Sequence, residues 1–455
     1  MVRKAASLAT ESLPECADSI ESHPYVPGLF ALSTYQVDQQ EIDREMRVCD
    51  TDAYVGGQDE PSTNSSSPPY TRRGMLRLYE ASRGEGDNTV QTRILSEEHM
   101  AAILDAKWTL ARPSYASNSS QGLLAVADAQ GHVTLHQLLG GEQASSLRHP
   151  WRLEQVADLE LNPSKALCLS LDWSDRARHY PSSHLSSGAT SGGDASLVVS
   201  QSDGSLAWLP SVEMAVTDSQ PAGTHGMVKD RMEADEGDEE SEDNDDGDED
   251  SVRFAPWPTA PYGLQRWHAH DHEAWIAAFN PHSSGQILWS GGDDLALKGW
   301  DIRTPLRGGK RQPTFVNRKS FDGGVTTMQA HRAADREHTW AVGSYDSRLR
   351  IFDARQPLRP VAEKEMPGGI WRLKWHPENA GLLLAGCMHG GFAVVRVGEG
   401  SEPEIVSTFE EHDSLAYGCD WDRAAGEGGR EEDEGGGTMI YSCSFYDKKL
   451  CAWRG

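Results

Sequence analysis

Three aromatic residues stand at one equivalent position of a pattern that repeats in the second half of the chain. The copies are aligned on the last residue of a short β-prone segment, and the position lies four residues before it. The residues found there are Trp275, Thr326, Trp371 and Tyr417. Each aromatic ring face can stabilise a bound cation by ~0.5–2 kcal/mol. Gathered on one face of a fold, these rings would hold a positively charged ligand. The alternative is ordinary packing of a central channel.

A histidine replaces the aspartate that other copies carry in a tight turn. The aspartates are Asp294, Asp346 and Asp447. One copy instead has His389, in the segment AGCMHGG. An imidazole titrates near neutral pH and is a common general base. Three further ionisable residues lie just before the first β-prone segments of their copies, on the same face. They are His272, Glu273 and Asp413. All four are candidate catalytic residues, and the alternative is that they are exposed loop residues.

Familiar catalytic signatures are absent from the sequence. It has no GxSxG nucleophile elbow, no P-loop and no dinucleotide-binding fingerprint. It also has no HExxH motif and no CxxC pair, so no metal site is predicted. No cofactor is expected either. For a reaction at His389, the sequence leaves three nucleophiles open, which are a bound water, Ser414 and Cys387.

These residues need a scaffold that repeats around an axis, and residues 267–303 show one unit of it. His270 lies nine residues before Phe279, and an Asn-Pro turn and a second β-prone run follow. The tight turn Gly-Gly-Asp-Asp then leads to a third run that ends in Trp300-Asp301. This spacing is typical of one blade of a WD-repeat β-propeller. One blade cannot bury its own faces, so further copies are expected.

Seven copies are found when the third strand of each candidate blade is aligned. They are 75–79, 132–136, 205–209, 296–300, 348–352, 392–395 and 449–453. The sequence therefore predicts an all-β fold, a seven-bladed WD-repeat β-propeller with disordered loop insertions, as a single domain over 1–455. The chain stops two residues after Trp453, which leaves no room for a fourth strand in the last blade. Residues 3–10 are expected to supply that strand and close the ring.

Several polar residues are predicted to have a structural role in the blades rather than a catalytic one. The set that stiffens a WD blade is matched by His270, Ser290, Asp294 and Trp300, and in later blades by Asp346, His412 and Asp447. A buried histidine paired with an aspartate satisfies polar groups that are costly to bury alone. His331 and His376 fall at first turns, on the face away from the candidate site, and are also interpreted as structural.

Composition restricts the class of protein. The net charge is -28, and Glu233 to Asp250 hold 13 acidic and no basic residues, which argues against nucleic-acid binding. No apolar run of about 18 residues occurs, so no membrane span is predicted. The seven cysteines form no CxxC pair and follow no secretory leader, which favours a reduced, cytoplasmic protein. Disorder is expected in four insertions, 36–73, 176–194, 215–258 and 423–436.

The C-terminal blades carry motifs that generic WD repeats do not share. They include HEAWIAAF (272–279), GGIWRLKWHP (368–377), LLLAGCMHGGF (382–392) and DSLAYGCDW (413–421). With ADSIESHP (17–24) and GMLRLYE (74–80) near the N-terminus, the chain resembles the WD-repeat diphthine methyl ester hydrolases of diphthamide biosynthesis. The resemblance implies hydrolysis of the methyl ester of methylated diphthine on translation elongation factor 2, which releases diphthine for the final amidation.

The resemblance gives the candidate residues specific roles. Methylated diphthine carries a trimethylammonium group beside its ester, and a wall of Trp275, Trp371 and Tyr417 would suit that cation. His389, oriented by Asp413 or Glu273, would activate water, and Arg372 or the amides near Gly390 would stabilise the oxyanion. The alternative functions are a non-catalytic scaffold and an adaptor that presents elongation factor 2 to other enzymes of the pathway.

Overall fold

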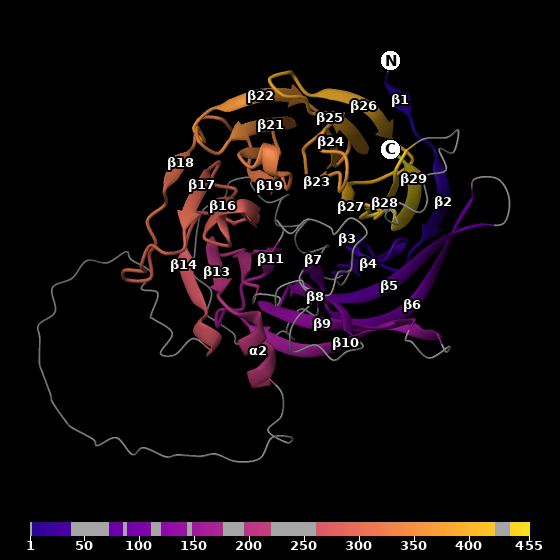
Figure 1. The fold of residues 1–455 in the computed structure, drawn as a ribbon, viewed down its shortest axis with the longest axis horizontal. Helices are drawn as coiled ribbons and strands as arrows, with labels where there is room; N and C mark the ends of the chain where they lie inside the picture. The colour runs from indigo at the N-terminus through magenta and orange to yellow at the C-terminus, as the bar shows by residue number, and fades with distance from the viewer. Residues whose placement is uncertain are drawn as a thin grey trace, which may run out of the picture.

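The chain forms a ring of seven antiparallel sheets, as predicted. The computed structural model describes residues 2–37, 72–84, 89–110, 120–142, 148–175, 195–219, 261–423 and 437–455. Within these residues each sheet has four strands, apart from one that has a fifth. The sheets stand around a common axis like the blades of a propeller (Figure 1). Each innermost strand contacts the innermost strands of both neighbouring blades, so the ring is closed.

The first three blades follow one another along the chain. Blade one comprises β3 (Ala17–Ser22), β4 (Leu29–Thr34), β5 (Arg73–Arg83) and β6 (Val90–Ala101). Blade two comprises β7 (Ile103–Trp108), β8 (Ser120–Asp128), β9 (His132–Glu142) and β10 (Arg148–Glu160). Blade three comprises β11 (Cys168–Trp173), β12 (Leu197–Gln201), β13 (Ser205–Leu209) and β14 (Gln265–His268), with helix α2 (Val212–Ser219) and the short helix η1 (Pro261–Gly263) between its last two strands.

The last four blades lie between residues 276 and 454. Blade four comprises β15 (Ile276–Phe279), β16 (Ile287–Gly291), β17 (Leu297–Asp301) and β18 (Phe315–Asn317), with η2 (Pro281–Ser283). Blade five comprises β19 (Val325–Ala330), β20 (Thr339–Ser344), β21 (Arg348–Asp353) and β22 (Pro360–Glu365), with η3 (Ala334–Arg336). Blade six comprises β23 (Arg372–Trp375), β24 (Leu382–Gly386), β25 (Phe392–Arg396) and β26 (Glu404–Phe409), and blade seven contains β27 (Ala416–Trp421), β28 (Met439–Ser444) and β29 (Lys449–Arg454).

The N-terminal segment adds to two blades rather than one. Strand β2 (Ser7–Ser12) pairs antiparallel with β29 and is the fourth strand of blade seven. Strand β1 (Arg3–Lys4) instead pairs parallel with β26, on the outer edge of blade six. The expectation that residues 3–10 form one strand is therefore wrong for residues 3–4. The consequence is that a single short segment ties blades six and seven together.

Five of the seven innermost strands have a bulge at one equivalent position. We call the residue four before the end of each innermost strand the position-two residue. The seven are Asp18, Leu104, Leu169, Trp275, Thr326, Trp371 and Tyr417. In blades one, two, three, five and seven the pairing with the second strand shifts register across this residue. A bulged residue is unpaired and its side chain is re-aimed, which sets these residues apart from the regular ladder.

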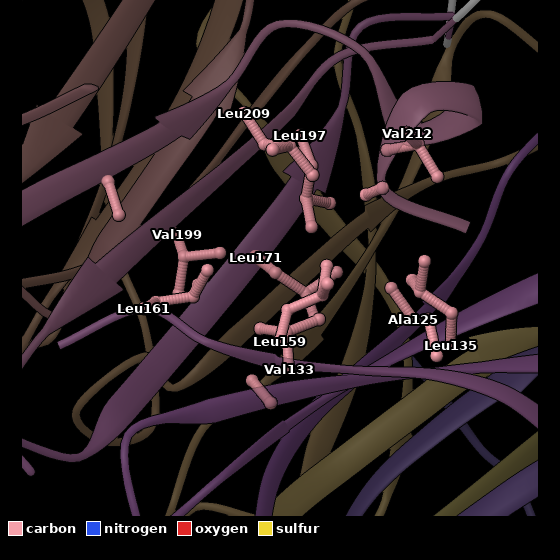
Figure 2. Close-up of a cluster of buried hydrophobic side chains, with 14 of the residues drawn as sticks. Ala125, Val133, Leu135, Leu159, Leu161, Leu171, Leu197, Val199, Leu209 and Val212 are labelled. Atoms are coloured by element: carbon pink, nitrogen blue, oxygen red, sulfur yellow. The ribbon is translucent and has the colours of Figure 1, made fainter. Parts of the chain in front are cut away.

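Apolar side chains pack between adjacent blades. Figure 2 shows the cluster between blades two and three, in which β8, β9 and β10 face β11, β12 and β13. Leu135, Leu171 and Leu197 are fully buried there, and Val212 of α2 covers the cluster. Burying one such side chain contributes ~1.5–3 kcal/mol. Because every cluster uses two blades, no blade is stable on its own.

The polar residues assigned to architecture have the predicted contacts in blade four. His270 pairs through Nδ1 with Asp294 (2.7 Å) and through Nε2 with Ser290 Oγ (2.7 Å). Trp300 Nε1 donates to the same Ser290 Oγ (2.8 Å). In blade seven the pattern differs, because His412 bonds Ser444 and Ser442, and Asp447 accepts from the backbone N–H of Asp413.

First-turn histidines connect neighbouring blades. His282 lies 3.0 Å from the carbonyl oxygen of His331, and the ring of His331 lies 3.0 Å from the carbonyl oxygen of Ala380. His376 Nε2 lies 2.7 Å from Thr438 Oγ1. These contacts link blade four to five, five to six and six to seven. The structural interpretation of His331 and His376 is therefore confirmed.

The predicted insertions lie largely outside the described residues. This applies to 38–71, 176–194, 220–260 and 424–436, and therefore to the acidic run. Residues 215–219 were predicted to be disordered, but they belong to α2, where Ala215 and Val216 are buried against blades two and three. The prediction grouped this short apolar face with the polar sequence of residues 220–258 and so missed it. In the described part of the chain, no helix is both long and apolar enough to cross a membrane.

Candidate functional site

The structure brings the three predicted aromatic residues together. The ring centroids of Trp275 and Trp371 are 5.6 Å apart, in an edge-to-face arrangement. Those of Trp371 and Tyr417 are 4.9 Å apart and the rings stack. All three side chains are half-buried. Blades four, six and seven thus contribute to one continuous aromatic surface at the position-two end of the channel.

Two further rings extend this surface. Tyr345 lies 6.1 Å from both Trp275 and Trp371, and Phe445 lies 5.2 Å from Tyr417, measured between ring centroids. We call these five rings the aromatic arc. The alignment of innermost strands missed Tyr345 and Phe445 because both lie in the turns after second strands. The signal that could have found them is the pair of segments GSYD and SFYD, in which aromatic residues precede the turn aspartate.

Carboxylates surround the arc on the blade-four side. Trp275 Nε1 donates to Asp293 Oδ1 at 3.2 Å, and the Asp293 side chain is exposed. Burial raises the pKa of the Tyr345 phenol, and the charges of Asp293 and Glu273 raise it further. A Cβ on Gly324 would lie 2.3 Å from Asp293 Oδ1, so a larger residue there would displace this carboxylate. A π-rich surface bordered by negative charge suits a cationic ligand.

The position-two residue of blade one is an acid that the sequence analysis missed. Asp18 is only 4% exposed, and its Oδ2 has no hydrogen-bond partner among the described residues. Burial raises the pKa of Asp18 to about 8, against the opposing effect of Arg372. Extending the alignment of innermost strands from blade seven into blade one would have placed this carboxyl group beside Tyr417.

Arg372 lies in the channel and is already paired. Its Nη1 donates to Asp105 Oδ1 of blade two at 3.0 Å, and both side chains are buried. Lys107 Nζ donates to the other carboxylate oxygen of Asp105 at 2.6 Å. The pair spans the channel from blade six to blade two. The guanidinium is therefore oriented by Asp105, and an oxyanion-stabilising role for Arg372 would fall to the N–H groups that this ion pair does not use.

His389 lies on an exposed turn beside the arc. The turn is closed by the Cys387 N–H, which donates to the Gly391 carbonyl at 2.8 Å, and the Met388 carbonyl accepts from Ala416 N–H next to Tyr417. In the described part of the chain, no hydrogen bond reaches the ring of His389. Nothing there fixes its orientation or tautomer, so its role as general base stays a prediction.

The other three predicted ionisable residues are not joined to His389. Asp413 is exposed and forms an ion pair with Lys449, which lowers the pKa of its carboxyl group. His272 is exposed, whereas Glu273 is half-buried near Tyr345. Within the described residues, none of these side chains is hydrogen-bonded to His389. The structure therefore groups Glu273 with the arc and leaves His272 and Asp413 at its periphery.

The predicted nucleophiles differ in availability. Cys387 is fully buried, and burial raises the pKa of its thiol to about 12. A thiolate is the reactive form, so Cys387 is a poor nucleophile at neutral pH. Ser414 Oγ accepts a hydrogen bond from the Tyr446 N–H at 3.0 Å. Over the described ranges, no group of His, Cys, Asp and Glu side chains could hold a metal ion. Ser414 and a bound water both stay open as nucleophiles.

Comparison with known proteins gives several relatives of one name that match most of the chain. No protein-family model matches the chain. Diphthine methyltransferase of Homo sapiens is 30% identical over 426 residues, which cover 91% of this chain and 74% of the human protein. The Mus musculus protein of the same name is 30% identical over 83% of this chain and 64% of its own length. The diphthine methyltransferase homolog of Dictyostelium discoideum is 27% identical over 98% of both chains.

A solved structure supports the fold alone. A chain of the mitotic checkpoint complex crystal structure superposes with a TM-score of 0.55 over 99% of this chain and 92% of its own, at 12% identity. At that identity the likeness carries no information about ligands or partners.

Proposed function

Since the chain belongs to the diphthine methyltransferase family, which places it in diphthamide biosynthesis, we propose that it hydrolyses the methyl ester of methylated diphthine on translation elongation factor 2. The products are diphthine and methanol. Elongation factor 2 is then both substrate and partner, and the released carboxylate is the group that the final amidation needs.

The observation that carries the proposal is the aromatic arc with its neighbouring carboxylates. Methylated diphthine presents a trimethylammonium group that has no N–H and cannot donate an ordinary hydrogen bond. Ring faces and nearby negative charge are the protein groups that bind such a cation well. The Trp371 ring lies 5.6 Å from that of Trp275 and 4.9 Å from that of Tyr417, between centroids, and Asp293 and Glu273 supply the charge.

The same arrangement suits attack by water on the adjacent ester. A cation held against the arc fixes the side chain that carries both groups, which limits where the carbonyl carbon can lie. Water adds to that carbon, its proton passes to a base, and the bond to the methoxy oxygen breaks. The methoxy group leaves as methanol when the proton is returned. No metal or cofactor is needed for this sequence of steps.

The mass of the substrate distinguishes the possible functions. Purified protein is incubated with elongation factor 2 that carries methylated diphthine, and the modified peptide is weighed. Hydrolysis removes the mass of one CH₂ group and releases methanol. Gain of the same mass on unmethylated diphthine, with a methyl donor present, would instead support methyl transfer, the activity in the relatives' name. Binding without any change in mass would support a scaffold or adaptor, and the hydrolase proposal would be wrong.

A further inference from the structure

We propose that Asp18 is the general base that takes the proton from the attacking water in this hydrolysis. The proposal rests on the proposed function and names a residue that the sequence analysis did not. On this proposal, a residue of blade one removes the proton from water, while blades four to seven hold the cation.

Position is the first argument. Asp18 and Tyr417 are the position-two residues of adjacent blades, and the innermost strands β3 and β27 are in contact. Both residues fall in the bulges where the ladder shifts register. The charge of Asp18 acts on the Tyr417 phenol and on the Arg372 guanidinium. Asp18 therefore acts on residues of blades six and seven, and one of them is Tyr417 of the aromatic arc.

The second argument is that one buried oxygen of the carboxyl group, Oδ2, is unused by the fold. Buried polar side chains in proteins are almost always hydrogen-bonded. Asp105, another acid close to Arg372, accepts from Arg372, from Lys107 and from the Leu171 N–H. Asp18 is as deeply buried, yet its Oδ2 has no such partner within the described residues. A buried acceptor of this kind is satisfied when a water or substrate donor occupies the site.

The third argument is the proton affinity. The pKa of Asp18, raised by burial to about 8, lies close to the working pH, where general bases are most effective. The groups that act electrostatically with it are Arg372, Asp105, Tyr417 and Cys443. A trimethylammonium bound against the arc adds positive charge beside it and favours the carboxylate. Substrate binding would thus help to deprotonate the base.

The step balances without an additional reactant. Asp18 carboxylate accepts one proton from water as the water oxygen bonds to the ester carbon. The tetrahedral intermediate collapses, the bond between the carbonyl carbon and the methoxy oxygen breaks, and Asp18 returns the proton to form methanol. The new carboxylic acid then ionises.

The test compares Asp18→Asn with two other variants of this protein. The substrate is elongation factor 2 that carries methylated diphthine, and the measured quantity is the rate of methanol release. Loss of a general base lowers kcat by ~10²–10⁴-fold, whereas KM should stay within a factor of about 3, since the cation site is intact. Asp353→Asn is the matched control, because that acid pairs with Arg355 at the end of β21 and lies outside the arc. His389→Ala tests the competing base. The fold of each variant is checked by its melting temperature.

The pH dependence of the wild-type chain gives a second readout. For wild type, kcat/KM should rise with pH through an apparent pKa near 8. The value of kcat should also rise with pH, but through a lower apparent pKa, because the bound cation lowers the pKa of the carboxyl group. Wild-type kcat in Asp18→Asn, or a change in KM alone, would overturn the role. So would a larger loss of kcat in His389→Ala, or a flat wild-type profile if Asp18→Asn does not fold. If wild type releases no methanol, the proposed function itself fails.

Discussion

Trp371 is the central ring of the aromatic arc, in contact with Trp275, Tyr345 and Tyr417. Replacing Trp371 by alanine should remove one ring face from the cation and raise KM about 2- to 30-fold, the equivalent of ~0.5–2 kcal/mol. Trp371→Phe keeps a ring, so its KM should lie between those of the wild type and Trp371→Ala. Steady-state kinetics on folded protein measure both. An unchanged KM in Trp371→Ala would show that the arc does not bind substrate.

Asp105 is the carboxylate that pairs with two buried cations in the channel, Arg372 and Lys107. In Asp105→Asn, Arg372 and Lys107 would both remain buried without their carboxylate. Breaking a buried ion pair by removing one partner costs ~3–5 kcal/mol, so chemical denaturation should show a loss of that order. Asp353→Asn, whose partner Arg355 is exposed, should show little change. Equal stability of the two variants would contradict this account of the channel.

The sequence predicted part of the candidate site for a physical reason. Trp275, Trp371 and Tyr417 could be aligned because a repeat places equivalent residues at equivalent angles around the axis. Contacts between a strand of one blade and a turn of another obey no such rule, so Tyr345 and Phe445 were missed. The sequence also does not reveal which side chains form hydrogen bonds or ion pairs with one another. The sequence could not show that Arg372 is held by Asp105, nor that His389 has no described partner, because both depend on side chains far apart in the chain.

At the scale of elements, strands β1 and β2 hold the ring closed. Deleting residues 1–12 would remove the fourth strand of blade seven and leave β29 as an open edge. It would also remove the parallel pair with β26. We expect a clear fall in melting temperature. Deleting only residues 1–2, which precede β1, should have little effect. If the longer truncation melts like the full chain, the two strands do not fasten the ring.

The strands themselves were predictable because each blade repeats the same run of β-prone segments and turns. The predicted third strand 205–209 coincides with β13, and the predicted third strand 348–352 lies within β21. The helix α2 and the split between β1 and β2 were not predicted. Neither belongs to the repeat, and each depends on packing against strands of another blade.

At the scale of the whole molecule, buried histidines make the ring sensitive to acid. Burial lowers the pKa of His331, His376 and His412 to about 4. Between about pH 6.5 and 4 the unfolded chain binds protons that the folded chain does not, so stability falls as the pH falls. The slope is up to ~1.4 kcal/mol per pH unit for each histidine. Denaturation midpoints measured across this range check the sign. Constant stability down to pH 4 would contradict it.

The central claim is that water cleaves the ester at the carbonyl carbon, in a site built from blade one and blades four to seven. Its most direct test is hydrolysis in water labelled with heavy oxygen, with mass analysis of the modified elongation factor 2 peptide and of the methanol. We predict that the label enters the diphthine carboxylate and that the methanol is unlabelled. Label in the methanol, or a peptide that keeps its methyl group, would contradict the claim.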